Sequence, residues 1–182
     1  MLVPEAIQDG FIAATNAVQG PVVSLGTRVS PVGSFTDPEH AQVGLREAKA
    51  RETHEVLTAT VRFESTTRTI IDGRTLGFCK LVVDRKMGAI LGCHVIGERA
   101  VDIAQAAAIA IAGGMRVDDV ARVPLAYPTY AGVLGRAAAS AARQLNLAVD
   151  WGASHDGTIE IATRDGDPAS PTPPREGRSS LA

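Results

Sequence analysis

The two cysteines are the residues of this sequence best suited to redox chemistry. They are Cys79 and Cys93, separated by thirteen residues. Together they would make either a redox-active dithiol or two buried thiols that pack as small hydrophobic side chains. The strand register derived below makes them diagonal neighbours, ~7–8 Å apart, whereas the Cα atoms of a disulfide lie ~4.4–6.8 Å apart. The sequence therefore favours two free, buried thiols.

The sequence does not indicate a metal site or a phosphate-binding loop. The histidines are scattered, without the spacing of zinc ligands. Gly113-Gly114 is followed by no Lys-Ser or Lys-Thr pair, so it is interpreted as a helix stop rather than a phosphate loop. The sequence also contains neither G-x-G-x-x-G nor Cys-x4-Cys. We therefore expect no metal site, and for His94 a place at the sheet surface or the core edge. The four histidines are His40, His54, His94 and His155.

A β-hairpin over residues 76–96 is the central predicted element. Two apolar runs, 76–84 and 89–96, flank the polar link 85–88, whose final glycine suits the left-handed position of a tight turn. A three-residue loop, 86–88, puts both apolar sets on one face of the hairpin, and a two-residue loop would split them. The predicted face comprises Cys79, Leu81, Val83, Leu91, Cys93 and Val95. The predicted pairs are Cys79 with Val95, Leu81 with Cys93, and Arg85 with Ala89.

The segment 100–112 is predicted to be a buried helix. Only Asp102 and Gln105 are polar in it, and a helix that is apolar all round is buried on several sides. It is too short to span a bilayer, which takes ~20 apolar residues. Its small side chains permit close approach to a sheet or to another subunit. We expect it to cover the apolar face of the sheet.

The remaining pattern completes an α+β fold, an antiparallel sheet backed by helices. Residues 56–64 alternate between apolar and polar, as a half-buried strand does. The segment 65–69 is interpreted as a polar link, and 123–130, with its two prolines, as a rigid extended segment. Helical spacing or capping residues predict further helices, and a short strand is predicted beside them. These helices are 7–18, 45–51, 115–121 and 131–145, and the strand is 41–44.

Composition narrows the function classes. The formal net charge is −2 and no basic cluster stands out, so nucleic acid is not an expected partner. The first residues lack the basic and apolar regions of a signal peptide, and no segment is long enough to cross a bilayer. We expect a soluble, cytoplasmic protein. Residues 158–163 are interpreted as a weak strand, and 166–182, with four prolines, as a disordered tail.

Four segments, in order and at matching spacing, resemble the C-terminal dimerisation domain of the pyridine nucleotide-disulfide oxidoreductases. That family includes dihydrolipoamide dehydrogenase, glutathione reductase, mercuric reductase and the soluble transhydrogenase. The resemblance covers residues 22–145, and the helix at 10–20 resembles the last helix of the family's flavin domain. The four segments are 35–44 (Phe-Thr-Asp-Pro-Glu through Val-Gly), 77–97 (with Ile-Leu-Gly-Cys-His-Val-Ile-Gly), 100–113, and 124–143 (with Tyr-Pro-Thr at 127–129).

The resemblance implies a twofold dimer and a division of the chain. Residues 1–21 would be the remnant of a flavin-domain helix, 22–149 the dimerisation domain, and 150–182 a weakly structured extension. In the family, FAD and NAD(P) bind to N-terminal domains, so this chain alone is expected to bind neither. The partners that the resemblance implies are a second copy of the chain, as a homodimer, and a flavin domain.

The resemblance also locates an altered site. In the family's disulfide reductases, a His-Pro-Thr segment brings a histidine into the partner subunit's active site, and a Glu five residues later orients it. Here Tyr127 and Gly132 occupy those positions. Tyrosine titrates near ~10 and is a poor proton shuttle at neutral pH. We therefore predict no catalytic residue, and an interface or gating role for Tyr127, Pro128, Thr129 and Tyr130.

Three functional hypotheses follow. The first is the dimerisation domain of an FAD-dependent, NAD(P)-linked oxidoreductase, inactive on its own. The second is a free-standing interaction module that pairs with a separate flavoprotein subunit, because the apolar face of helix 7–18 needs a partner surface. The third is a truncated gene product without function.

Overall fold

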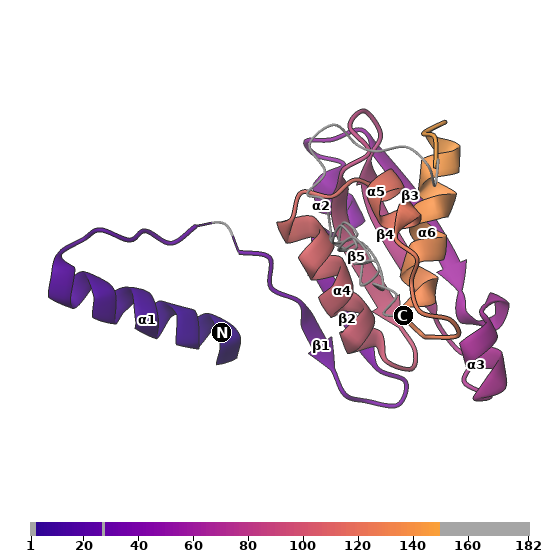
Figure 1. Cartoon of the computed structure of the whole chain (residues 1–182), viewed down its shortest axis with the longest axis horizontal. Coiled ribbons are helices and arrows are strands. Elements are labelled where there is room, and N and C mark those ends of the chain that lie inside the picture. The colour runs from indigo at the N-terminus through magenta and orange to yellow at the C-terminus, as the bar shows by residue number, and fades with distance from the viewer. Residues whose placement is uncertain (1–2, 27, 150–182) are drawn as a thin grey trace, which may run out of the picture. The chain divides into compact units, whose positions relative to one another are not determined.

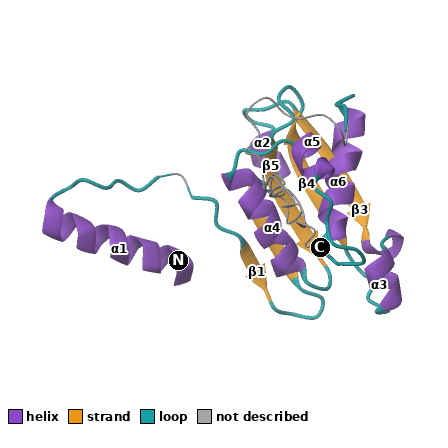
Figure 2. Ribbon diagram, viewed as in Figure 1, coloured by secondary structure: helices purple, strands orange, loops and turns teal. Residues whose placement is uncertain are grey.

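An antiparallel sheet of five strands forms the centre of the protein (Figures 1 and 2). The computed structural model of the chain describes residues 3–26 and 28–149. The strand order is β1-β2-β5-β4-β3, and each neighbouring pair is antiparallel. The predicted α+β class is confirmed. The strands are β1 (Val32–Ser34), β2 (His40–Gly44), β3 (Val56–Arg62), β4 (Phe78–Asp84) and β5 (Ile90–Ile96).

Helices cover the apolar face of this sheet. α4 (Ala100–Ala112) packs on β2 and β5, as predicted, while α6 (Gly132–Gln144) packs on β3 and β4. α5 (Val117–Arg122) lies against α6. One continuous core joins the inward side chains of the strands to the alanine-rich faces of α4 and α6. The alanines allow the helices to approach the sheet closely.

The hairpin register is confirmed over most of its length and wrong near the turn. Leu81 pairs with Cys93 and Cys79 with Val95, as predicted. The register shifts between Val82 and Val83, so that Val83 pairs with Ile90 and Ala89 hydrogen-bonds Asp84 rather than facing Arg85. This β-bulge inserts one residue into β5. Ile90 therefore joins the main core, whereas Leu91, predicted on that face, packs with Val82 on the opposite side.

The segment after β3 differs from its prediction as a strand end and polar link. β3 ends at Arg62, and the chain forms the 3-10 turn η1 (Phe63–Ser65) and the short helix α3 (Thr67–Ile71). The hydroxyl groups of Thr66 and Thr69 both donate to the carbonyl oxygen of Phe63. These local bonds replace the strand ladder, which explains why the alternating pattern breaks here.

Two further helices complete the described residues. α1 (Val3–Gln19) extends the predicted helix 7–18 at both ends and contains no buried residue. α2 (Glu47–Ala50) is shorter than the predicted helix 45–51. Among the helices of the described residues, none combines the length and apolarity needed to cross a bilayer. The expected strand at 158–163 and tail at 166–182 lie outside the described residues.

Candidate functional site

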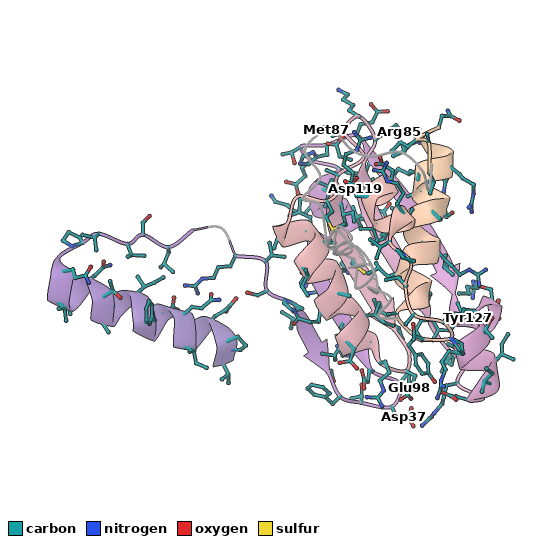
Figure 3. All side chains as sticks on the ribbon, in the orientation of Figure 1. Asp37, Arg85, Met87, Glu98, Asp119 and Tyr127 are labelled. Carbon is teal, nitrogen blue, oxygen red and sulfur yellow. The ribbon has the colours of Figure 1, made fainter. Side chains whose placement is uncertain are left out.

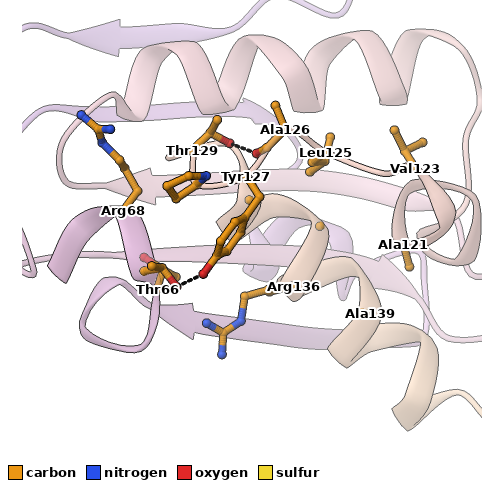
Figure 4. A pocket seen from close by; sticks show the side chains of 14 residues that line it. Thr66, Arg68, Ala121, Val123, Leu125, Ala126, Tyr127, Thr129, Arg136 and Ala139 are labelled. Atoms are coloured by element: carbon orange, nitrogen blue, oxygen red, sulfur yellow. Dashed lines mark hydrogen bonds between the residues drawn. The ribbon is translucent and has the colours of Figure 1, made fainter. Parts of the chain in front are cut away.

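The segment that carries Tyr127 joins α5 to α6 beside the short helix α3. The Tyr127 hydroxyl donates to Thr67 Oγ1 at 2.8 Å, so it reaches from the connecting segment to the start of α3 (Figure 4). Thr129 Oγ1 donates to the carbonyl oxygen of Ala126 at 2.7 Å, which closes a local turn. The ring of Tyr127 remains largely exposed. In Figure 3 it lies near the end of the domain that carries Asp37 and Glu98, away from Arg85 and Met87.

Tyr130 makes a second, charged link to α3. Its hydroxyl donates to Asp72 Oδ2 at 2.8 Å, and Arg68 Nε donates to the same oxygen at 2.8 Å. The bond from Tyr130, together with the one from Arg68, holds the pKa of Asp72 below its usual value. Loss of hydration, with the nearby Asp72 carboxylate, raises the pKa of Tyr130 to about 12. The phenol therefore stays protonated and donates throughout the physiological range.

Tyr130 is expected to titrate near pH 12 in the folded chain, whereas a free tyrosine titrates near ~10. Because the pKa of Tyr130 is higher in the folded state, its contribution to stability is complete below pH ~10 and is lost as the pH rises toward 12. Ultraviolet titration of the two tyrosines, repeated on Tyr130→Phe, would assign the high step. A high step that survives in Tyr130→Phe would contradict the assignment.

A cavity of about 370 Å³ lies between the Tyr127 segment, α3 and α6 (Figure 4). Its walls are mostly small apolar side chains, and its polar groups come from α3, α6 and the Tyr127 segment. Arg136 of α6 donates through Nη1 to the carbonyl oxygen of Ser65. The cavity is lined by Thr66, Thr67, Arg68, Ala121, Val123, Leu125, Ala126, Tyr127, Pro128, Thr129, Gly132, Gly135, Arg136 and Ala139.

The positions 127 and 132 do not form an acid–base pair. Gly132 is the first residue of α6, and a Cβ added there would meet no atom within 4 Å. The hydrogen-bond partner of Tyr127 is a neutral threonine hydroxyl, which does not serve as a general base toward it. The arrangement can hold and orient groups by hydrogen bonding, and it offers no proton relay.

The two cysteines lie in the sheet core, away from solvent. Both are buried and free, and their Sγ atoms are 3.8 Å apart. The hydrogen bond to Cys93, followed by burial, raises the pKa of the Cys79 thiol well above its usual value. A thiol must ionise to act as a nucleophile or redox centre. The interpretation as two buried hydrophobic-like side chains is therefore confirmed in its geometry.

Two histidines have structural partners. His54 Nδ1 donates to Asp84 Oδ2 at 2.7 Å, and Asp84 also accepts the amides of Lys86 and Met87, which lower its pKa together with His54. His94 is half-buried, as expected, and donates to the Leu45 carbonyl oxygen at 3.3 Å. Burial lowers its pKa. His155 lies outside the described residues.

Neither a metal nor a dinucleotide finds a cradle in residues 3–26 and 28–149. Within these ranges, no group of three or more His, Cys, Asp or Glu side chains could hold a metal ion. Dinucleotides bind where a parallel strand leads into a helix N-terminus, and the sheet here is antiparallel at every pairing. The residues of these ranges do not fit FAD or NAD(P).

Sequence reasoning missed the partners of the two tyrosines. Thr67 begins α3, at a position that the sequence pattern presented as a link, and Asp72 directly follows the last residue of α3. Arg136 was assigned only to a helix. One available signal was the dipeptide Asp72-Gly73, because Gly73 adopts a φ of +67° at the end of α3. A glycine at that position is a common helix stop.

The sequence of the folded part of the chain matches a known class of protein. Residues 30–138 match the sequence profile described as the dimerisation domain of the pyridine nucleotide-disulphide oxidoreductases. The chain therefore belongs to that family through its dimerisation domain.

Particular relatives include two kinds of enzyme. A mercuric reductase from Bacillus cereus is 36% identical over 127 residues, which are 69% of this chain and 20% of the relative. A dihydrolipoyl dehydrogenase from Synechocystis is 36% identical over 142 residues, or 75% of this chain and 30% of the relative. The chain thus spans less than a third of the length of these curated relatives.

Solved structures share the fold. LpdA from Mycobacterium tuberculosis superposes with a TM-score of 0.68 at 24% identity, over 76% of this chain and 30% of that one. The HOCl-induced flavoprotein disulfide reductase RclA from Escherichia coli superposes with a TM-score of 0.66 at 18% identity, over 73% of this chain and 31% of that one. The expected fold class is confirmed.

Proposed function

We propose that residues 22–149 are the dimerisation domain of an FAD-dependent, NAD(P)-linked oxidoreductase, and that two copies of this chain associate. The observation that carries this proposal is the match of residues 30–138 to a dimerisation domain. On its own the chain binds neither FAD nor NAD(P), because its antiparallel sheet offers no cradle for them. It therefore catalyses no flavin reaction alone.

The outer face of α4 is a suitable contact surface between copies. Positions 102, 105, 109 and 112 follow helical spacing and are all exposed, opposite the buried alanines. Ile109 is one of these four positions, and its large apolar side chain is 66% exposed. Small neighbours such as Ala106 would allow two such helices to approach closely.

The Tyr127 segment has a gating or interface role in this proposal. Tyr127 is exposed and only its hydroxyl is tied, by Thr67, so its ring is presented on the surface of the domain. Proline at 128 restricts the backbone beside it. In the assembled protein this ring would face the partner copy, and it would act by hydrogen bonding and by shape rather than by proton transfer.

Sedimentation with a visible absorption spectrum of the same sample tests the proposal. We expect a colourless dimer that does not oxidise NADH or NADPH. Ile109→Arg is expected to weaken association by about 2 kcal/mol, roughly 30-fold, as for a buried interface residue.

Met87→Arg is the matched control. Met87 is 67% exposed, comparable to Ile109, but lies at the β4–β5 turn. The Met87→Arg variant should leave the solution mass measured by sedimentation unchanged. A monomeric wild type would overturn self-association, and a dimer unaffected by Ile109→Arg would overturn the α4 contact alone.

A second candidate function is an interaction module for a separate flavoprotein subunit. The observation that favours it is the apolar side of α1, where Ile7, Phe11 and Val18 are all exposed. The sedimentation experiment separates the two. If Phe11→Ser leaves the dimer intact, α1 is not part of the contact between copies and remains available to another protein.

We also propose a cytoplasmic location. Both cysteines are free and buried side by side. Unpaired cysteines are typical of proteins in reducing compartments.

A further inference from the structure

We propose that the cavity between the Tyr127 segment, α3 and α6 binds a small apolar molecule that carries a carboxylate, with Arg136 as the ionic partner of that carboxylate. The proposal does not rest on dimerisation or on any redox reaction. It concerns only side chains of this domain.

The walls of the cavity suit an apolar ligand body. Its volume of about 370 Å³ lies in the range of ~300–1,000 Å³ found for small-molecule sites. Leu125 lies close to Gly135, whose absent side chain leaves room for it: a Cβ at position 135 would be 2.9 Å from Leu125 Cδ1. Leu125 therefore packs directly on the backbone of α6 within the apolar wall. It comprises Ala121, Val123, Leu125, Ala126, Gly135 and Ala139.

The charge at the rim defines the ligand's polar group. Two arginines line the cavity, and they differ in their partners. Arg68 is neutralised by Asp72, at 2.8 Å. Arg136 forms no ion pair within the described part of the chain, and its partner there is the neutral carbonyl oxygen of Ser65. A guanidinium has five N–H donors in a planar fork that matches a carboxylate. One bond to a carbonyl leaves donors available.

A second apolar groove on the same chain provides a comparison. It lies between α1 and the segment after it and is lined by Ile7, Phe11, Leu25 and Arg28, among others. Arg28 is ion-paired with Asp9. The two sites are alike in having apolar walls and an arginine, but of Arg28 and Arg136 only Arg136 lacks a carboxylate partner among the described residues. An anionic ligand should therefore distinguish between them.

Octanoate and octanol are suitable probes because they share a chain and differ in charge. In calorimetric titrations of the full chain, we expect saturable binding of one octanoate, and binding of octanol weaker by about tenfold or more, since a hydrogen bond to a charged group is stronger than one to a neutral group. Amide and methyl shifts in nuclear magnetic resonance spectra should move at Ala126 and Ala139.

Three variants examine the ionic contact. Arg136→Gln should weaken octanoate about tenfold and leave octanol unchanged. Gly132→Glu should have a similar effect. Position 132 lines the cavity, and a side chain there would enter open space. It lies four residues before Arg136 on the same helix, so a glutamate at 132 would pair with Arg136. An acidic residue in the first helical turn is also favourable, so this variant should fold. Gly132→Gln adds the same volume without charge and should weaken octanoate less.

Arg28→Gln is the matched control and should leave both probes unaffected. Equal affinity for octanoate and octanol, no saturable binding of octanoate, or an Arg136→Gln variant that binds octanoate like the wild type would each overturn the proposal. Shifts at Phe11 and Leu25 that disappear in Arg28→Gln would place binding at the other groove and overturn it as well.

Discussion

Replacement of Gly92 by alanine is expected to lower the free energy of unfolding by about 3 kcal/mol, as overpacking of a tight site does. Gly92 lies in β5, between Gly44 of β2 and Val82 of β4. A Cβ there would be 3.0 Å from the amide nitrogen and 3.1 Å from the carbonyl carbon of Leu45, and closer still to its carbonyl oxygen. These are backbone atoms.

The Leu45 backbone cannot move away easily, because its amide donates to the Leu91 carbonyl oxygen at 2.8 Å. Urea unfolding followed by circular dichroism would measure the loss. Gly132→Ala is the control, since a Cβ at that position meets nothing within 4 Å; in a helix it should be neutral or add up to ~1 kcal/mol. Equal stability of the two variants would contradict this account of the close approach.

The hairpin shows how far a sequence pattern reaches. Alternation of apolar residues was sufficient to predict that Leu81 pairs with Cys93, because a one-residue slip would have moved every apolar side chain to the wrong face. Near the turn, the β-bulge shifts the register, so alternation no longer predicts which side chain faces the core. Ile90 and Leu91 are both apolar, so either could face the core, and hydropathy alone could not show that Ile90 does.

The helix α3 was missed for a different reason. It has only five residues, too few to be stable through helix propensity alone. It is held by tertiary and side-chain contacts: the Thr66 and Thr69 hydroxyls bond to the Phe63 carbonyl oxygen, and Tyr127 and Tyr130 bond to Thr67 and Asp72. Tyr127 and Tyr130 lie 60 and 58 residues from Thr67 and Asp72 in the chain, so no local pattern records these two bonds.

The candidate site, too, could be predicted from the sequence only in part. The correspondence of position 127 follows from the Tyr-Pro-Thr phrase, and that of position 132 from its place five residues later, both of which the family resemblance supplies. The cavity beside them depends on the path of the 123–130 segment past α6, and the special status of Arg136 depends on which side chains it does not meet. Charge partners of surface arginines are set by the fold, so the sequence could not single out Arg136 from the other arginines.

Phe63→Ala is expected to lower the free energy of unfolding by about 3–5 kcal/mol, the usual range for truncating a fully buried phenylalanine. Phe63 is 0% exposed. Its ring lies against the backbone at Gly97, where a Cβ would be 2.8 Å from Phe63 Cδ2, and its centroid is 6.4 Å from that of Tyr130. Alanine would leave a cavity between the sheet end and the tyrosine segment. Phe35→Ala is the matched control, because Phe35 is 83% exposed and should change stability by less than ~0.5 kcal/mol.

The same substitution should change the titration of Tyr130, which connects the core to the candidate site. Loss of hydration is the main cause of the raised pKa of Tyr130, and the Phe63 ring lies beside it, with the two ring centroids 6.4 Å apart. We expect the Phe63 ring to contribute to that loss of hydration. In Phe63→Ala under conditions where the chain is still folded, the pKa should fall from about 12 toward ~10. An unchanged pKa would mean that the Asp72 bond alone holds the proton, and that the ring stabilises the fold without shaping the site. A lowered pKa would show that the packing of one core side chain determines the protonation of the tyrosine that anchors α3.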